Sequence, residues 1–225
     1  MNKLKALVAA AAVSVVAFAA APASAVGVNL LQNGSFEDMT GIDPLGNPDW
    51  GVYQNIPGWE SFVGTGIEIQ RGNLGGSAAQ DGLNKVELDS DPSRGGDGQA
   101  STTNSDMQQS VALTAGRYSF SFMYRGRTNN SGTNGIDFVL TNTTVGPDFV
   151  TGIASDGWTL IERTFTLAAD ASVDVIFEAT GTADRLGGYI DNVSLTAVPL
   201  PPAVALFGAA LAGLGFLGRR RRKSA

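Results

Sequence analysis

The protein has 225 residues, with 15 lysines and arginines against 21 acidic residues, and its formal net charge is −6. It has neither cysteine nor histidine, which excludes disulfides, thiol nucleophiles, imidazole bases and the zinc or haem sites that depend on these residues. Carboxylate, hydroxyl, amide, guanidinium and aromatic groups remain for chemistry. The 29 glycines favour many tight turns between short strands rather than helices.

Residues 1–25 predict a secretory signal peptide. Lys3 and Lys5 give a positively charged start, residues 6–20 are small and apolar, and residues 23–25 (Ala-Ser-Ala) are typical of a cleavage site. The alternative, an amphipathic helix on a membrane surface, lacks the polar face that such a helix needs. We therefore expect the chain to be exported.

The C-terminal tail, residues 198–225, has three parts. Residues 198–202 (Val-Pro-Leu-Pro-Pro) are rigid and extended, residues 203–218 are uncharged and apolar, and residues 219–223 are basic. As a helix the apolar part is about 24 Å long, against about 30 Å for a bilayer core, so it is a short transmembrane segment with its basic end in the cytoplasm. The residues that define the tail are Val198, Pro199, Leu200, Pro201, Arg219, Arg220, Arg221 and Arg222.

A proline motif, an apolar helix and an arginine cluster, in this order and behind a signal peptide, resemble the PEP-CTERM sorting signal. The resemblance covers about the last 28 residues, and Leu200 stands where that signal usually has glutamate. It implies a protein that a Gram-negative bacterium exports, with a transient stage in the inner membrane, and that a membrane peptidase called exosortase processes before release to the cell surface. The alternative is a permanent membrane anchor.

Alternating apolar and polar residues indicate strands between residues 26 and 197, where no long stretch has helical periodicity. Turn pairs such as Asn33-Gly34 and Asn134-Gly135 separate them. About ten short strands predict an all-β fold, a jelly-roll sandwich that forms one domain over residues 26–197, with helices only at the two ends of the chain. Strands are expected at residues 28–32, 66–70, 84–89, 107–113, 118–124, 136–140, 161–167, 173–178 and 189–195, with long loops at residues 38–55 and 90–105.

Motifs near both ends of this domain carry a second resemblance. Residues 29–37 read Asn-Leu-Leu-Gln-Asn-Gly-Ser-Phe-Glu, residues 188–195 read Gly-Tyr-Ile-Asp-Asn-Val-Ser-Leu, and Pro57-Gly58-Trp59 lies between them. The domain resembles the galactose-binding-like jelly rolls of carbohydrate-binding modules. It is most similar to a family of unknown function that plant cell-wall proteins share with bacterial PEP-CTERM proteins.

This resemblance implies a structural calcium site at Glu37 and Asp191, with help from the Ser35 carbonyl. Calcium takes about six to eight oxygen ligands, so groups near Asp81 would have to join them. The residues lend some support, because Asp191 lies in an otherwise apolar strand where a buried carboxylate needs a cation or several donors. The alternative is that Asp191 accepts hydrogen bonds from backbone N–H groups in a bulge.

A set of polar side chains alternates with apolar ones on the predicted strands and therefore shares their non-core faces. Carboxylates and amides bind sugar hydroxyls, and an exposed tryptophan stacks on a sugar ring. Arg127 could add a further donor. The alternative is a buried tryptophan beside a merely solvated acidic face. The predicted saccharide-binding residues are Trp59, Glu68, Gln70, Glu87, Asp89 and Arg125.

Two other acidic arrangements have weaker support. Glu68 and Glu87 form a candidate glycosidase pair if their strands are neighbours, because glycosidases use two carboxylates about 5–9.5 Å apart. Residues 89–91 (Asp-Ser-Asp) with Asp97 suggest a second calcium loop, but they lack the EF-hand spacing, which favours a solvated loop.

The sequence favours a non-catalytic, exported module that binds surface polysaccharide or is embedded in it. Seven cations lie in the two ends, so eight basic residues face 21 acidic ones in residues 26–197, a net charge of −13. That charge argues against nucleic acid or anionic lipid as a partner of the domain. The alternatives are a structural surface or biofilm-matrix protein without a specific ligand and, less favoured, a glycoside hydrolase.

Overall fold

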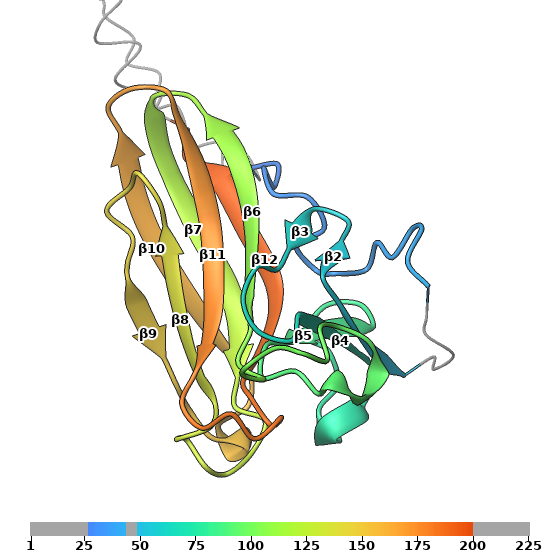
Figure 1. Ribbon diagram of the computed structural model, residues 1–225. Helices are drawn as coiled ribbons and strands as arrows, with labels where there is room; N and C mark the ends of the chain where they lie inside the picture. Colours follow the sequence, from blue (N-terminus) through green and yellow to red (C-terminus); the bar gives the residue numbers. More distant parts are fainter. Residues whose placement is uncertain (1–26, 44–48, 200–225) are drawn as a thin grey trace, which may run out of the picture. The chain divides into compact units, whose positions relative to one another are not determined.

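The computed structural model describes residues 27–43 and 49–199. The predicted signal peptide lies outside these residues, as does the predicted tail apart from its first two residues. Residues Val26–Val198 form one compact unit, shown in Figure 1. In the part of the chain that the structure describes, no helix is long and apolar enough to cross a membrane.

The described residues form twelve strands in two six-stranded antiparallel sheets. This confirms the predicted all-β jelly-roll sandwich. Sheet A contains, in spatial order, β1 (Trp50–Tyr53), β4 (Ile67–Arg71), β5 (Asn84–Glu87), β12 (Tyr189–Ala197), β7 (Gly116–Arg125) and β10 (Thr159–Leu167). Sheet B contains β2 (Asn55–Ile56), β3 (Trp59–Glu60), β6 (Asp106–Leu113), β11 (Ala171–Thr180), β8 (Gly135–Leu140) and β9 (Asp148–Val150). Three short 3₁₀ helices, η1 (Leu74–Gly76), η2 (Pro92–Arg94) and η3 (Ala154–Asp156), lie in the connections.

The chain passes from one sheet to the other at most of its connections, so strands that pair are seldom consecutive. The central strand of sheet A is the clearest case, because β12 closes the domain yet lies between β5 and β7. This crossing brings side chains from distant parts of the sequence onto one sheet face.

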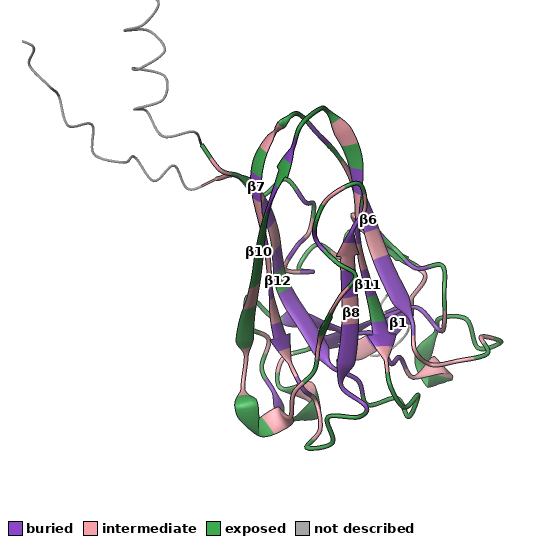
Figure 2. Cartoon of the chain, turned by 90° about the vertical axis from the view of Figure 1, so that its left-hand side faces the viewer, coloured by how far each residue is buried: buried purple, intermediate pink, exposed green. Residues whose placement is uncertain are grey.

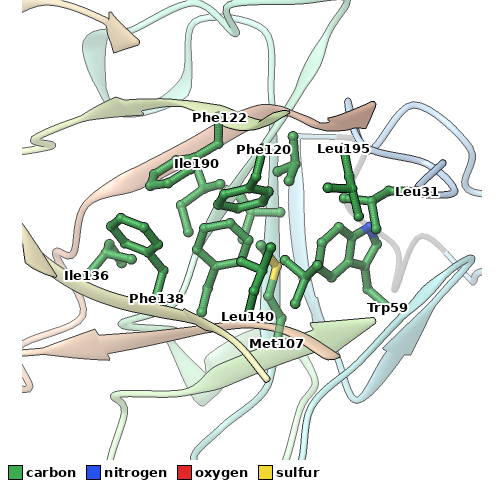
Figure 3. Close-up of a cluster of buried hydrophobic side chains, with 14 of the residues drawn as sticks. Leu31, Trp59, Met107, Phe120, Phe122, Ile136, Phe138, Leu140, Ile190 and Leu195 are labelled. Atoms are coloured by element: carbon green, nitrogen blue, oxygen red, sulfur yellow. The ribbon is translucent and has the colours of Figure 1, made fainter. Parts of the chain in front are cut away.

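The core lies between the two sheets, and Figure 2 shows buried residues along the inner strands. The alternation predicted for β7 holds, since Phe120 and Phe122 are fully buried. Phe122 makes edge-to-face contacts with Phe138 of β8 and Phe177 of β11, at centroid distances of 5.0 and 4.9 Å. Edge-to-face packing of this kind stabilises aromatic pairs beyond the area they bury, and it joins the two sheets (Figure 3).

Trp59 belongs to this core, so the sugar-stacking role that we predicted for its ring is wrong. Only 2% of Trp59 is exposed, and its ring packs against Phe36 and Phe177. Figure 3 shows it beside Leu31 and Leu195. Its indole N–H donates to the Asn33 carbonyl oxygen at 3.2 Å, which satisfies the polar end of the side chain inside the core.

The strand predicted at residues 28–32 does not form, although the segment lies beside β12. The Leu30 N–H donates to the Leu195 carbonyl oxygen. The side chain of Asn29 takes the place of further main-chain hydrogen bonds between the segment and β12. Its amide nitrogen donates to the Val193 carbonyl oxygen, and its oxygen accepts from the N–H groups of Leu31 and Leu195. A side chain that satisfies backbone groups in this way offers the chain an alternative to strand pairing.

The loop predicted over residues 38–55 was wrong at its end, because Trp50–Tyr53 form the edge strand β1. Trp50, Val52 and Tyr53 are strand-forming residue types, but a run of four residues that includes Gly51 is too short to be recognised as a strand from its alternation. Pairing with β4, with Trp50 opposite Gln70 and Val52 opposite Glu68, is what orders them. The short strands β2, β3 and β9 were also absent from the prediction: β3 and β9 pair with the longer strands β6 and β8, and β2 pairs with β3.

Candidate functional site

Register across sheet A gathers the predicted polar residues on its outer face. Glu68 of β4 lies opposite Glu87 of β5, and Glu87 lies opposite Tyr189 of β12. Because Ile69 and Val86 point into the core, alternation directs Glu68, Gln70 and Glu87 to the other face. The expectation that these three polar side chains share a non-core face is confirmed.

That face is covered by connections and is not a solvated acidic surface. Glu68 is 2% exposed and Glu87 is fully buried. The amide nitrogen of Gln70 donates to Glu68 Oε1 at 2.7 Å and to Glu87 Oε2 at 2.5 Å, so it joins the two carboxylates. Main-chain N–H groups of Asp91 and Gly187 donate to Glu68 Oε2 and Glu87 Oε1, which ties both covering connections to the sheet.

Arg127, which follows β7, supplies the compensating charge. Its guanidinium forms an ion pair with Glu87 and donates to the Arg185 carbonyl oxygen at 3.1 Å. Burial raises the pKa of Glu87 well above its usual range, Glu68 raises it further, and Arg127 opposes both effects. Burial also raises the pKa of Glu68, against the N–H of Asp91 and the amide of Gln70. The cluster therefore holds two carboxylates whose charged forms depend on one guanidinium.

Lys85 lies opposite Gln70 and belongs to the same buried polar layer as Glu68 and Glu87. Its ammonium group donates to the Leu74 carbonyl oxygen at 3.0 Å and lies over the Tyr189 ring, 4.9 Å from the centroid. Burial lowers the pKa of Lys85 to about 8, against the attraction of Glu87. The Tyr189 hydroxyl donates to Gln70 at 3.1 Å, so Lys85 and Tyr189 hold the floor of the site rigid.

A hollow of about 310 Å³ opens above this layer, and we call it the first hollow. Its aromatic member is Trp50 of β1, with Arg94 stacked at 4.8 Å from the Trp50 ring. Residues that sequence reasoning placed in loops complete it, notably Asp91 and Arg185. The side chains that line the first hollow include Trp50, Glu68, Gln70, Asp91, Arg127 and Arg185.

Of the six predicted saccharide-binding residues, only Glu68 and Gln70 line the first hollow, whereas Trp59, Glu87, Asp89 and Arg125 do not. Asp89 is fully buried and holds the connection before β12, because its Oδ2 accepts from the N–H groups of Asp184 and Leu186. Arg125 lies opposite Tyr189 on β7, and its Nε is buried without a hydrogen-bond partner. Asp89 thus positions the site rather than lining it. Arg127, two residues further along the chain, lines the hollow and supplies the guanidinium donor that we predicted at Arg125.

A larger groove of about 520 Å³ lies along β6 on sheet B. Amide side chains line it, among them Gln32, Asn55 and Gln108. Of the predicted set it includes only the buried Trp59. The first hollow is the better candidate because it brings the predicted residues Glu68 and Gln70 together with an aromatic ring, Trp50, and the guanidinium of Arg127.

Glu37 and Asp191, the predicted calcium ligands, hold the same short segment before β5. Asp191 Oδ2 accepts from the N–H groups of Gln80 and Asp81 at 2.6 and 3.0 Å. Glu37 Oε1 accepts from Leu83 N–H at 2.8 Å and from Asn84 N–H at 2.6 Å. The alternative for Asp191, backbone hydrogen bonds in a bulge, is what the structure has, since the β12 register shifts between Asp191 and Ser194.

The residues around Glu37 nevertheless fit a hard cation. Asn84 donates its amide to the Phe36 carbonyl oxygen at 2.7 Å, which leaves Asn84 Oδ1 buried without a partner. An unpaired amide oxygen beside a carboxylate is an oxygen ligand set of the kind that calcium takes. Ser35, whose carbonyl oxygen was a predicted ligand, immediately precedes Phe36 in the chain. Among residues 27–43 and 49–199, no three acidic side chains are grouped to hold a metal ion, so main-chain and amide oxygens would complete the shell.

No family model and no curated protein matches the sequence, whereas solved structures match the fold. A Stig cyclase from Fischerella sp. TAU, solved with an indole compound, has a TM-score of 0.51 at 13% identity over 77% of this chain and 98% of the other. The galactotriose-bound module TmCBM61 has a TM-score of 0.47 at 19% identity over 76% and 99%. The CBM22 tandem of Paenibacillus barcinonensis Xyn10C has a TM-score of 0.43 at 14% identity over 81% and 50%.

The likeness to the cyclase shows a shared β-sandwich fold and nothing finer. At identities below 20% the shared property is the fold, and function has to be argued from the site.

Proposed function

We propose that this protein is an exported, non-catalytic module that binds neutral saccharide chains in the first hollow. The observation that supports the proposal is the composition of that hollow: the Trp50 ring stands beside Glu68, Gln70 and Arg127, whose positions are fixed by hydrogen bonds. An aromatic face with a few rigid polar groups is the usual make-up of a saccharide site. Ionised carboxylates have several acceptor positions, so Glu68 can accept from a ligand hydroxyl while keeping its internal bonds.

Charge favours a neutral ligand over an anionic one. The domain carries eight basic against 21 acidic residues. In the first hollow, Glu68, Asp91 and Asp184 face only Arg127 and Arg185, and Arg127 is already paired with Glu87. An anionic polymer would meet repulsion at the site and over the surface.

Affinity electrophoresis of the full-length protein tests the proposal. The gels contain β-1,4-galactan, a soluble β-glucan, xylan or, as the anionic probe, polygalacturonate. We expect at least one neutral polymer to retard the protein and polygalacturonate to leave it unaffected. Trp50→Ala should abolish the retardation, whereas Phe62→Ala, which removes an aromatic ring that is 65% exposed and does not line the hollow, should not.

Absence of retardation by every polymer would overturn saccharide binding and favour the second candidate, a structural matrix protein without a specific ligand. Burial of Trp59 is the observation that favours this candidate, because it removes one of the residues expected to touch sugar.

Glycoside hydrolysis is the alternative within the same hollow. Its support is the pairing of Glu68 with Glu87 on adjacent strands and their raised pKa values. Against it, each of the four carboxylate oxygens already accepts an internal hydrogen bond, and Glu87 is fully buried. Release of reducing sugar from the retained polymer, lost in Glu68→Gln, would establish hydrolysis; its absence supports a binding module.

We propose also that calcium binds beside Glu37 and Asp191 and stabilises the fold. Bound there, it would supply positive charge to two carboxylates, and Asn84 Oδ1 would gain the partner that it lacks. EDTA should lower the melting temperature and added calcium restore it, with Asn84→Ala abolishing the response. A melting temperature unmoved by both additions would exclude the metal.

Export and sorting complete the proposal and rest on the two ends of the sequence. We propose that residues 1–25 direct secretion and that an exosortase acts at residues 198–202, so that the domain reaches the surface of a Gram-negative cell after an inner-membrane intermediate.

A further inference from the structure

A second hollow of about 370 Å³ lies next to the first, and Arg185 lines both. Most of its other walls come from the connection between β5 and β6, where Ser101 and Thr102 contribute hydroxyl groups and Asp97 a carboxylate, and Thr65 adds a hydroxyl group from the connection between β3 and β4. Chain segments that line one hollow also line the other. Asp91 borders the first and Pro92 the second, while Asp184 borders the first and Ala183 the second.

An ion pair stands at the boundary. Arg185 Nη1 lies 3.5 Å from Asp91 Oδ1, with 53% and 30% of the two side chains exposed. Exposed pairs of this geometry contribute little to stability because water screens them. A ligand with hydroxyl groups can therefore replace this contact at low cost and hydrogen-bond to both side chains.

The main chain holds Arg185 in a conformation that non-glycine residues seldom adopt. Its φ is +69°, in the left-handed region where a side chain is strained. Asp89 Oδ2 accepts from the N–H groups of Asp184 and Leu186, the two residues that flank Arg185. Arg127 donates to the carbonyl oxygen of Arg185. Three hydrogen bonds from buried or half-buried side chains thus fix a strained residue between two hollows, a pattern that marks ligand-binding positions.

We propose that the two hollows are adjoining subsites of one extended cleft for a neutral oligosaccharide chain, and that Arg185 contacts the chain where it passes from one subsite to the other. The inference rests on the proposed function and refines it. The second hollow has one carboxylate, Asp97, and one guanidinium, Arg185, among neutral hydroxyl and apolar groups, so it too suits an uncharged, hydroxyl-rich ligand. The ligand class is therefore a chain longer than the first hollow alone can hold.

Calorimetry with a length series tests this cleft. Oligosaccharides of two to six units, prepared from the neutral polymer that retards the protein, are titrated into the full-length protein. We expect affinity to rise by about tenfold or more between the shortest and the longest, because the second subsite adds contacts to an already bound chain. Ser101→Leu, which fills the second hollow at a residue without internal side-chain hydrogen bonds, should remove the rise and leave the shortest ligand unaffected. Ser155→Leu on η3 is the matched control.

Arg185→Gly separates ligand contact from a structural role. Glycine adopts the left-handed conformation without strain, so the melting temperature should stay the same or increase, while affinity for the longest ligand falls to that of the shortest. A fall in melting temperature with unchanged affinity would show that Arg185 only holds the two connections together, and would overturn the proposal. Affinity independent of chain length overturns the extended cleft but leaves saccharide binding intact, whereas failure of every polymer to bind overturns both.

Discussion

The buried pair of Arg127 and Glu87 shows how single residues of this site depend on one another. Glu87 is fully buried, and its charge is matched by a guanidinium from a residue 40 positions further along the chain. Desolvation makes an unpaired carboxylate costly at this position. Residues of the first hollow therefore contribute to stability as well as to the binding that we propose.

Arg127→Ala should destabilise the protein by about 3–5 kcal/mol, because it leaves Glu87 buried without a compensating charge. Urea unfolding followed by tryptophan fluorescence measures the loss. Arg163→Ala, which removes the more exposed ion pair with Asp148, is the control and should cost no more than about 1 kcal/mol. Equal losses for the two variants would contradict the compensating role of Arg127.

Trp59→Ala should destabilise the protein by about 3–5 kcal/mol through the cavity it leaves in the aromatic core. Its hydrogen bond to Asn33 is lost as well. Trp59→Phe should cost less, since a ring still packs between Phe36 and Phe177. Retained saccharide affinity in Trp59→Phe would agree with a core role, whereas a stable variant that no longer binds saccharide would restore the surface role that burial excludes.

At the scale of elements, the segment between η1 and β5 is held at two places by carboxylates from other parts of the chain. Asp191 of β12 binds its start and Glu37 its end. Gly82 between them has a φ of +66°, and a Cβ there would collide with the Glu37 carboxyl group. A tight glycine turn and two distant carboxylates thus build one local structure.

Asp191 should give folding a dependence on pH. Burial raises the pKa of Asp191 to about 6, against the opposing N–H donors of Asp81, Asn192 and Gln80. The folded state then binds a proton that the unfolded state, with a pKa of 3.8, has released. The free energy of unfolding contributed by Asp191 therefore falls as pH rises from about 4 to about 6.

Asp191→Asn should reduce that slope by up to about 1.4 kcal/mol per pH unit, the limit for one proton. Urea unfolding at intervals between pH 4 and 7, without divalent cations, measures the slopes. Asp170→Asn on an exposed turn is the control. Glu68 and Glu87 act in the same direction and stay in both variants, so identical slopes in the wild type and Asp191→Asn would show that the folded state does not retain the Asp191 proton.

At the scale of the whole molecule, charge is distributed unevenly along the chain. Seven of the 15 basic residues lie in the first 25 residues and the C-terminal tail, and every acidic residue lies between them. The domain that would remain after processing at both ends is therefore strongly acidic, with a net charge of −13. Such a domain should stay soluble and avoid anionic surfaces.

Processing of the tail is testable on the native protein. Mass spectrometry of protein recovered from the cell surface should find no peptide beyond about Pro202, because the basic end of the tail would stay with the membrane. Peptides from the domain provide the internal control for coverage. Recovery of the intact arginine cluster from surface material would show instead that the tail is a permanent anchor.

Alternation and turn pairs in the sequence were sufficient to predict the sandwich and most of its longer strands, because each strand places apolar residues on one face whatever its partner. The same alternation predicted that Glu68, Gln70 and Glu87 share a face. Short strands such as β1 could not be predicted, since four residues that include Gly51 give too little alternation to recognise, and it is the pairing with β4 that shows Trp50 and Val52 to be in a strand.

The sequence by itself thus determined the fold class, the acidic character of the domain and the polar face of sheet A. Only the tertiary structure decided that Trp59 is core, that Arg127 rather than Arg125 pairs with Glu87, and that Arg185 stands between two hollows. The physical reason is that strand patterns depend on neighbouring residues in the chain. Burial and the partners of a charge depend instead on which connections cross a sheet face, and in a jelly roll those connections come from distant parts of the chain.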